Sequence, residues 1–357
     1  MECIRGEDMN RFRDSLIEGF RIAMAYIGTV VGAGFATGQE ILQFFTHYGI
    51  LSFWAILISV VLFIFVGRSI MIYSSNLRVK SFGKLAAHLF GAAAPFVNLY
   101  LGVTFILVCG AMFAGAGALF EEHWGIPYLL GAIITAFLTL LVTLKGVKGI
   151  LAVNVVIVPY LIIFNLLIFV YVLSKDMKPP VMFQSYSSGE VFDLVRTGVI
   201  YASFNIVLSI GVLASLGSEI RDKKTLTWGS ILGGGFLGIL LAQGNYILLC
   251  HIPEIFYAEI PLMVIISQMG SFFITAYSVA IWAEIFTTAV GNLFSIHTAL
   301  NGRYKTPSFL PALCVTVLGL GICLLGFSNI VAWFYPALGI IGLVLSILIL
   351  FKTFVSF

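Results

Sequence analysis

The chain has 357 residues, of which 60% are hydrophobic and only 10% are charged, with a formal net charge of +3. A soluble domain of this length does not need so much apolar surface, and several apolar stretches exceed the roughly twenty residues that span a bilayer. These properties exclude a soluble protein and predict a polytopic membrane protein without a separate soluble domain. The polar stretch 1–18 is not expected to be a cleavable signal, because the apolar run after it is too long.

Ten apolar segments follow one another, and short amphipathic pieces at Ser81–Phe90 and Ile260–Gly270 precede the third and the eighth. The segments cover residues 19–46, 49–75, 94–119, 126–144, 149–174, 194–220, 225–250, 271–298, 308–327 and 331–355. From the sixth onward, the order of spans and surface helix in the first half is repeated. Because five is odd, the repeats 19–174 and 194–355 must cross the membrane in opposite directions. The sequence therefore predicts a single all-α domain over residues 1–357, with ten transmembrane helices in a five-plus-five inverted repeat.

The distribution of basic residues predicts the orientation. If the N-terminus is cytoplasmic, sixteen of the 19 Lys and Arg residues lie in inner loops or at inner ends. The other three, Lys175, Lys178 and Arg196, lie in one outer connection. Since cytoplasmic loops of membrane proteins carry an excess of Lys and Arg, we expect a multi-pass protein of the cell membrane with both termini in the cytoplasm.

Four glycines interrupt the first apolar segment, at Gly28, Gly32, Gly34 and Gly38. Each glycine disfavours a helix by roughly 0.5–1 kcal/mol relative to alanine, so four within eleven residues favour an opening of the helix. In a bilayer the freed backbone groups must be satisfied by protein, water or ligand, and a mid-membrane break is a typical binding site. Close packing of neighbouring helices is the alternative explanation.

A second copy of the pattern favours the break. The stretch 32–41 aligns with 211–220, so that two glycines, a glutamate and an isoleucine recur at matching positions. Corresponding Gly-interrupted segments in two halves point to the binding site of a transporter. We therefore predict that helices 1 and 6 are both discontinuous.

The paired breaks and the inverted repeat resemble the amino acid–polyamine–organocation superfamily, whose five-plus-five architecture is also called the LeuT fold. The stretch Gly28–Glu40, GTVVGAGFATGQE, resembles the opening of the YkvI-type bacterial membrane proteins. The resemblance covers the whole chain in topology, and only the first and sixth segments match at the level of motifs.

The resemblance implies a substrate site at the first break. In this superfamily a Gly-x-Gly run at the break offers free amides to the carboxylate of the substrate, and Gly32, Ala33 and Gly34 match that run, with Thr29 one turn before it. Unpaired N–H groups at the start of a half-helix suit an anion. Close packing is the structural alternative for Gly34.

The sixth segment contributes the other candidate substrate residues. Asn205 must face the protein interior because an unpartnered amide in hydrocarbon costs several kcal/mol, but it can bind substrate or join two helices. Ser203 and Ser209 can bond back to their own helix and are weaker candidates. Phe204 matches the aromatic lid that relatives place here, although most of the 32 Phe residues must face lipid or core.

Glu284 lies near the middle of the eighth segment, without a Lys or Arg in that segment. A charge at the bilayer centre costs roughly 3 kcal/mol, so Glu284 must be protonated, hydrogen-bonded or paired with a cation. Thr287 and Thr288 follow one turn later on the same face. The resemblance implies that their hydroxyls and the carbonyls of Gly28 and Val31 form a sodium site, for which hard oxygen ligands are suitable. A neutral, hydrogen-bonded Glu284 is the structural alternative.

The coupling ion stays open between Na⁺ and a proton, because Glu284 replaces the small residue usual in the superfamily. Proton-coupled relatives often carry a Lys on the fifth span, where this chain has Asn154 and Asn165, and this favours Na⁺. Glu40 and Glu219 lie about six residues past the breaks, roughly 9 Å along a helix. For these two carboxylates a structural or gating role is favoured over contact with substrate.

The resulting hypothesis is an ion-coupled secondary transporter of a small organic solute, an amino acid or a relative, working by alternating access. The alternative is a ligand sensor of the same fold that does not transport, similar to germinant-receptor subunits. A divalent-metal transporter is disfavoured because neither break offers acidic and thioether ligands, and an enzyme because no reacting groups are positioned for chemistry. The expected partners are a small-molecule substrate and the bilayer, with no cofactor other than Na⁺ and no nucleic acid; a homo-oligomer is left open.

Overall fold

Long apolar runs must form helices in a bilayer, because a helix satisfies its own backbone hydrogen bonds. The structure is a computed structural model that describes residues 2–177, 188–258, 260–301, 309–327, 330, 342–345 and 347–348. Every regular element within these ranges is a helix. The all-α prediction is therefore confirmed for the described residues, whereas most of the predicted tenth segment, 331–355, lies outside them.

Thirteen α-helices and three short 3₁₀-helices make up the described chain. In chain order they are α1 (Glu2–Val30), α2 (Ala33–Thr37), α3 (Gln39–Phe44), η1 (Thr46–Leu51), α4 (Ser52–Leu77), α5 (Phe82–Phe90), η2 (Gly91–Ala93), α6 (Ala94–Trp124), α7 (Tyr128–Leu144), α8 (Val147–Ser174), α9 (Ser188–Glu219), α10 (Lys223–Leu249), η3 (Glu254–Tyr257), α11 (Pro261–Ser267), α12 (Ser271–Asn301) and α13 (Phe309–Cys323).

The predicted segments correspond closely to these helices. Segments two to nine become α4, α6, α7, α8, α9, α10, α12 and α13, and the amphipathic pieces become α5 and α11. Among the described residues, six stretches are helical, long and apolar enough to cross a membrane, and α7 and α13 are shorter apolar helices. Large apolar side chains such as Phe65, Phe96 and Val156 are exposed on the outer faces, as expected for contact with lipid.

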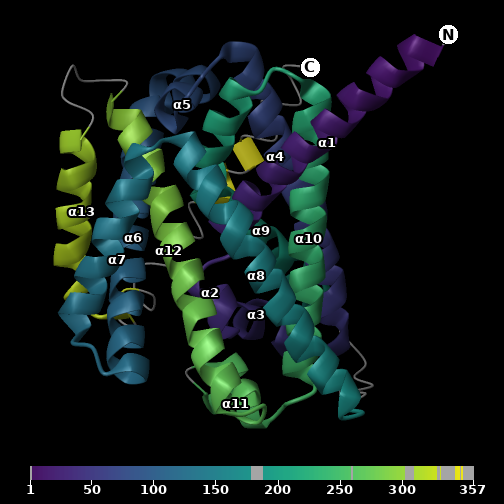
Figure 1. Cartoon of the computed structure of the whole chain (residues 1–357), viewed down its shortest axis with the longest axis vertical. Coiled ribbons are helices and arrows are strands. Elements are labelled where there is room, and N and C mark those ends of the chain that lie inside the picture. The colour runs from purple at the N-terminus through teal and green to yellow at the C-terminus, as the bar shows by residue number, and fades with distance from the viewer. Residues whose placement is uncertain are drawn as a thin grey trace.

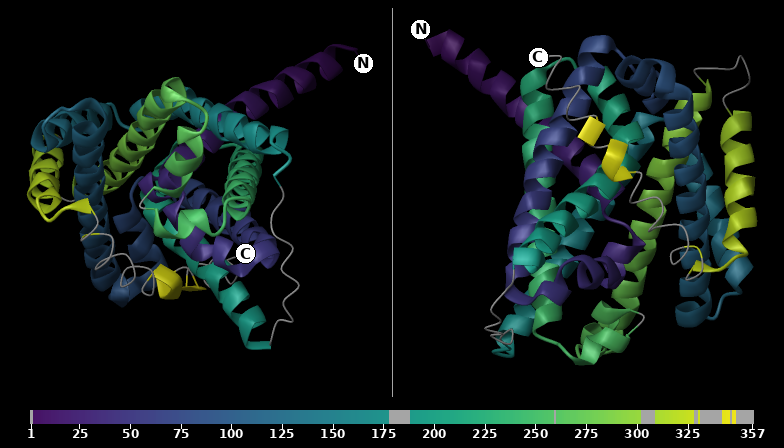
Figure 2. Two further views of the ribbon diagram at one scale, coloured as in Figure 1. Left: turned by 90° about the horizontal axis from the view of Figure 1, so that it is seen from below. Right: turned by 180° about the vertical axis from the view of Figure 1, so that it is seen from behind.

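Helices α9, α12 and α1 carry the longest continuous runs of buried residues in the described chain, and residues 283–297 of α12 are all buried. Residues 201–217 of α9 are all buried, and so are residues 22–32, which form the end of α1 and the connection to α2. Helix α1 packs mainly against α10, and α9 mainly against α4. Figure 1 shows α6, α7 and α13 together on one side, with α12 between them and the helices around α9, and Figure 2 gives the same arrangement from below and from behind.

The two surface helices lie at opposite ends of the molecule, α5 at the top and α11 at the bottom of Figure 1. The short helices α2 and α3 lie at an intermediate height inside the bundle (Figure 1). The non-helical connection between α1 and α2 therefore lies inside the bundle, where its polar backbone groups have little access to water.

The predicted second break is wrong, because α9 runs from Ser188 to Glu219 without interruption. The glycines that suggested it serve close packing instead. A Cβ atom at Gly211 would collide with Ser295 of α12, and one at Gly217 would collide with the backbone of Met71 in α4. Both glycines keep a negative φ, so α9 retains its helical hydrogen bonds while its neighbours approach closely.

We predict that Gly217→Ala destabilises the protein by about 1–3 kcal/mol, because the added methyl group meets backbone that cannot rotate away. Gly235→Ala in α10 is the matched control, since a Cβ there meets no atom within 4 Å. The control should be neutral or more stable by up to about 1 kcal/mol, because alanine favours a helix. Thermal unfolding of the purified variants, followed by circular dichroism, measures both. Equal stability of Gly217→Ala and wild type would contradict the packing explanation.

Candidate functional site

The first predicted break is present, between Val30 at the end of α1 and Ala33 at the start of α2. The last helical hydrogen bond of α1 runs from the Val31 N–H to the Ile27 carbonyl, 2.8 Å. Gly32 then adopts an extended conformation, with φ −136° and ψ −171°, and its carbonyl accepts the first bond of α2 from Ala36. The carbonyls from Gly28 to Val31 are therefore released from the regular helical pattern, as at any helix end.

Helix α12 closes one side of the break. The Thr288 hydroxyl donates to the Val31 carbonyl at 2.9 Å, and the Thr287 hydroxyl donates to the Glu284 carbonyl at 3.1 Å. A Cβ at Gly32 would lie 3.1 Å from the Thr288 hydroxyl oxygen, so glycine allows this close approach. The structure thus joins Val31 to Thr288, and Glu284 stands one turn before Thr288 on the same helix.

The fifth predicted segment, α8, contacts the break from another side. A Cβ at Gly28 would collide with the Asn154 amide group. Asn154 donates from Nδ2 to the Ile150 carbonyl at 2.9 Å, but its buried Oδ1 has no hydrogen-bond partner. The sequence signal at Asn154 is limited to its place on the fifth span, where proton-coupled relatives often carry a Lys.

A small cavity lies between the break, α8, α10 and α12. Its volume is about 10 Å³, which is room for about one water molecule. It is lined by Ile27, Val31, Phe35, Ala36, Leu161, Asn165, Leu240, Tyr277 and Glu284. Glu284 is only 3% exposed, and both its Oε2 and the Oδ1 of Asn165 are buried without a partner. The Tyr277 hydroxyl donates to the Ala36 carbonyl at 2.6 Å and so ties α12 to the end of α2.

The candidate residues of α9 do not line this cavity. All four are buried, but Asn205 donates to the Tyr201 carbonyl at 3.0 Å and Ser209 to the Ile206 carbonyl at 3.1 Å, both within α9. The backbone of Phe204, next to Ser203, lies near Gly342. The Thr29 hydroxyl likewise bonds back to the carbonyls of Ala25 and Tyr26 in α1.

Glu40 is closer to the break than its distance along the chain suggested. Gly38 has φ +83° and ends α2 in a left-handed turn, after which α3 begins. This reversal lays the Glu40 side chain against Gly34, where a Cβ would collide with it. The carboxyl groups of Glu40 and Glu284 are close enough to interact electrostatically. By contrast, its counterpart Glu219 lies exposed at the end of α9.

The side-chain atoms without a hydrogen-bond partner around the break are all oxygens, and therefore hydrogen-bond acceptors. Five buried side-chain oxygens on α3, α8 and α12 have no hydrogen-bond partner: Glu40 Oε2, Asn154 Oδ1, Asn165 Oδ1, Glu284 Oε2 and Asn292 Oδ1. The buried residues of the described chain include no Lys or Arg. Because unsatisfied buried acceptors are costly, this arrangement suits a cation or a donor group.

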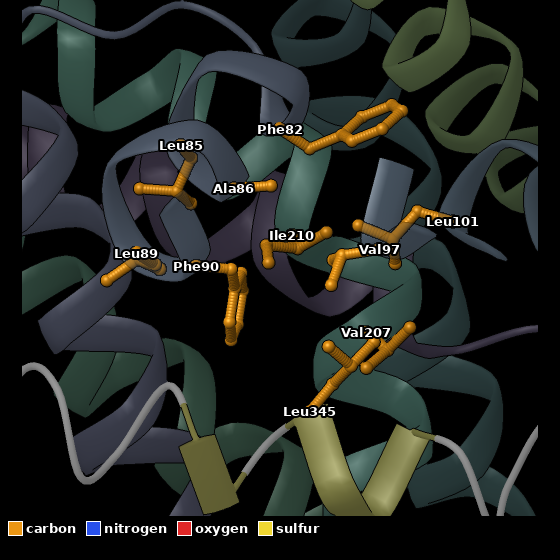
Figure 3. Close-up of a pocket in the computed structure, with 10 residues that line it drawn as sticks. All are labelled: Phe82, Leu85, Ala86, Leu89, Phe90, Val97, Leu101, Val207, Ile210 and Leu345. Atoms are coloured by element: carbon orange, nitrogen blue, oxygen red, sulfur yellow. The ribbon is translucent and has the colours of Figure 1, made fainter. Parts of the chain in front are cut away.

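A second cavity, of similar volume, lies under the surface helix α5 and is apolar (Figure 3). It is lined by Phe82, Leu85, Ala86, Leu89, Phe90, Val97, Leu101, Val207, Ile210 and Leu345. Such a lining offers no group that orients a polar solute, so this cavity belongs to the packing of α5 on α6 and α9.

Two proteins of Bacillus subtilis strain 168 are similar to this chain over nearly its whole length. The uncharacterized membrane protein YkvI is 32% identical over 328 residues, which cover 90% of this chain and 92% of the relative. The uncharacterized protein YyaD is 25% identical over 344 residues, covering 95% and 98%. No family model matches the chain.

Solved structures of transporters share the fold. A substrate-bound, outward-open Na⁺-coupled sialic acid symporter aligns with a TM-score of 0.68 and 13% identity, over 94% of this chain and 79% of its own. MhsT in complex with L-phenylalanine aligns with 0.66 and 16%, over 93% and 86%. Mhp1, a nucleobase-cation-symport-1 family transporter, aligns with 0.60 and 14%, over 91% and 74%. These likenesses show the fold, which is the LeuT fold that the sequence resemblance implied.

We predict that Tyr277→Phe lowers stability by about 0.5–1.5 kcal/mol, the usual contribution of one hydrogen bond, and loosens α2. Tyr128→Phe is the control, because the Tyr128 hydroxyl donates to the Cys323 carbonyl at 2.8 Å, far from the break. Both variants should lose stability, but only Tyr277→Phe should speed amide hydrogen exchange in residues 33–37. Unchanged exchange there in Tyr277→Phe would contradict the role of Tyr277 as an anchor of α2.

Proposed function

Because this chain belongs to the family of the Bacillus subtilis membrane protein YkvI and has the fold of secondary transporters, we propose that it is an ion-coupled transporter of a small organic solute. The solute is an amino acid or a related compound, carried across the cell membrane by alternating access. The observation that carries this proposal is the interruption of a buried helix at Val31–Gly32, beside a buried carboxyl group and a cavity. A purely structural bundle has no need of such a break.

The packing of the two halves supports a five-plus-five inverted repeat. The distribution of Lys and Arg supports a cytoplasmic location for both termini. In the predicted repeat, spans one and two are α1 and α4, and their counterparts in the second half are α9 and α10. Exchanging the two halves therefore converts the pair α1–α10 into the pair α9–α4. These are the two most extensive pairings among the helices of the described chain. The surface helices α5 and α11 at opposite ends of the bundle agree with the same exchange (Figure 1).

The coupling ion is proposed to be Na⁺, held by the carbonyls of Gly28 and Val31 and the hydroxyls of Thr287 and Thr288, beside Glu284. The hydrogen bond from Thr288 to Val31 supports this placement, because it brings two of these oxygens to 2.9 Å of each other. All five groups provide oxygen, which suits a hard cation. The unpartnered Oδ1 of Asn154 beside Gly28 adds a further acceptor.

The solute is proposed to bind along the break, against Thr29 and the backbone of Gly32, Ala33 and Gly34. Movement of α9 against α12 would bring the candidate residues Ser203, Phe204, Asn205 and Ser209 to the solute. Since α9 is continuous, this motion would be a tilt or rotation of the whole helix.

We predict that purified protein in liposomes accumulates a labelled amino acid when an inward Na⁺ gradient is imposed. Thr288→Val should reduce gradient-driven uptake at least tenfold, because it replaces one ion ligand with a methyl group. Thr316→Val is the control: the Thr316 hydroxyl is also buried, but it bonds back to Ala312 within α13. Uptake that is independent of both the Na⁺ gradient and the proton gradient would contradict the proposal. Binding of the solute without its accumulation in the liposomes would favour a ligand sensor.

A further inference from the structure

The turn at Gly38 places a carboxyl group where an incoming solute would meet the break. The left-handed conformation of Gly38 reverses the chain, and the absence of a side chain at Gly34 leaves the space that Glu40 fills. Gly34 lies in the first turn of α2, the stretch whose amides the sequence suggested as a receptor for a carboxylate. In the structure, the carboxylate beside these residues is the protein's own.

A second carboxyl group, that of Glu284, lies close enough to interact with Glu40 electrostatically. The buried residues of the described chain provide no Lys or Arg to neutralise either of them. A carboxylate on the solute would therefore be a third acidic group in this place, with no basic side chain to balance it. Like charges in a medium of low dielectric constant repel strongly, so this arrangement disfavours an anionic group and favours a cationic one.

The cavity beside Glu284 indicates the size of that cationic group. Its volume of about 10 Å³ holds one atom of the size of a water oxygen, which is also the size of an ammonium nitrogen. Two independent acceptors face it, since Glu284 and Asn165 both line the cavity and each has a buried oxygen without a partner. Asn165 is only 9% exposed. A carboxylate is bulkier than an ammonium nitrogen and has no N–H group to donate to these two acceptors.

From this geometry we infer that the cavity is an ammonium pocket: Glu284 and Asn165 accept hydrogen bonds from the solute's amino group, and Glu40 supplies a second negative charge. The inference rests on the proposed function and narrows its substrate class to solutes that carry a primary amine. An ammonium group has three N–H donors, so one protein acceptor or water completes its shell. The carboxylate of the solute is not required for recognition.

The test compares related compounds on the purified full-length protein at constant Na⁺. Each set contains an amino acid, the amine without its carboxylate, and the acid without its amino group: leucine with 3-methylbutylamine and 4-methylpentanoate, phenylalanine with 2-phenylethylamine and 3-phenylpropanoate, and alanine with ethylamine and propanoate. In at least one set, the amine and the amino acid should raise Tm by several degrees, and the acid should not. An acid that stabilises as well as its amine, or a panel without any stabilising amine, would overturn the inference.

Three variants assign the effect to the pocket. Glu284→Gln and Glu40→Gln keep the shape but remove a charge, so each should raise the amine concentration for half-maximal stabilisation at least tenfold. Gly34→Ala should act in the same direction, because its methyl group displaces the Glu40 side chain without changing the charge. Glu219→Gln is the matched control at an exposed carboxylate and should leave the amine response unchanged. Undiminished affinity in Glu284→Gln would overturn the inference.

Transport measurements separate this inference from the proposed function. Gradient-driven uptake of a deaminated acid would overturn the ammonium pocket and leave the transporter assignment standing. An amine that stabilises the protein through Glu284, but never accumulates in liposomes under either gradient, would leave the pocket standing and overturn the transporter assignment.

Discussion

The hydrogen bond from Thr288 to the Val31 carbonyl is the contact on which the architecture of the site depends. A helix that opens inside a membrane protein exposes carbonyls that water cannot reach, and each needs another partner. Here one released carbonyl is bonded by α12, the same helix that carries Glu284. The Tyr277 hydroxyl bonds the Ala36 carbonyl and fixes the other end of α2 to α12. The interruption is therefore held open by one neighbouring helix, and any movement of α12 must change the geometry of the break.

The two halves of the chain use related glycines for different purposes. In α1 to α3, Gly38 supplies a left-handed backbone conformation, and Gly32 leaves room for the Thr288 hydroxyl beside the break. In α9, Gly211 and Gly217 supply only the missing side chain, which lets Ser295 and Met71 approach. The asymmetry has a consequence for function. The first half provides the released backbone groups and Glu40, while the second provides Glu284 and the uninterrupted helix α9.

Much of the fold could be predicted from the sequence, because long apolar runs in a bilayer must form helices. The break at Val31–Gly32 was predictable since four glycines fall within eleven residues, and Glu284 because a charge in an apolar segment needs a partner. The break predicted near Gly211 failed because glycine has the same signature in a kink and in a close contact. The position of Glu40 could not be predicted, since it depends on the left-handed turn at Gly38. Tyr277 and Asn165 reach the cavity only through tertiary packing.

Charge balance would connect the proposed cation site to the proposed solute site. Two ionised carboxylates, Glu40 and Glu284, without a basic partner are strongly unfavourable in a buried position, so they must be balanced by protons or cations. One Na⁺ and one ammonium group would neutralise both carboxylates, and either one alone would leave a net negative charge. Each therefore raises the affinity of the site for the other, by the same coupling free energy in both directions. In this arrangement the coupling of ion and solute needs no direct contact between them. The coupling follows because the ion and the solute together neutralise the carboxylates of Glu40 and Glu284 at the break, which α12 holds in place.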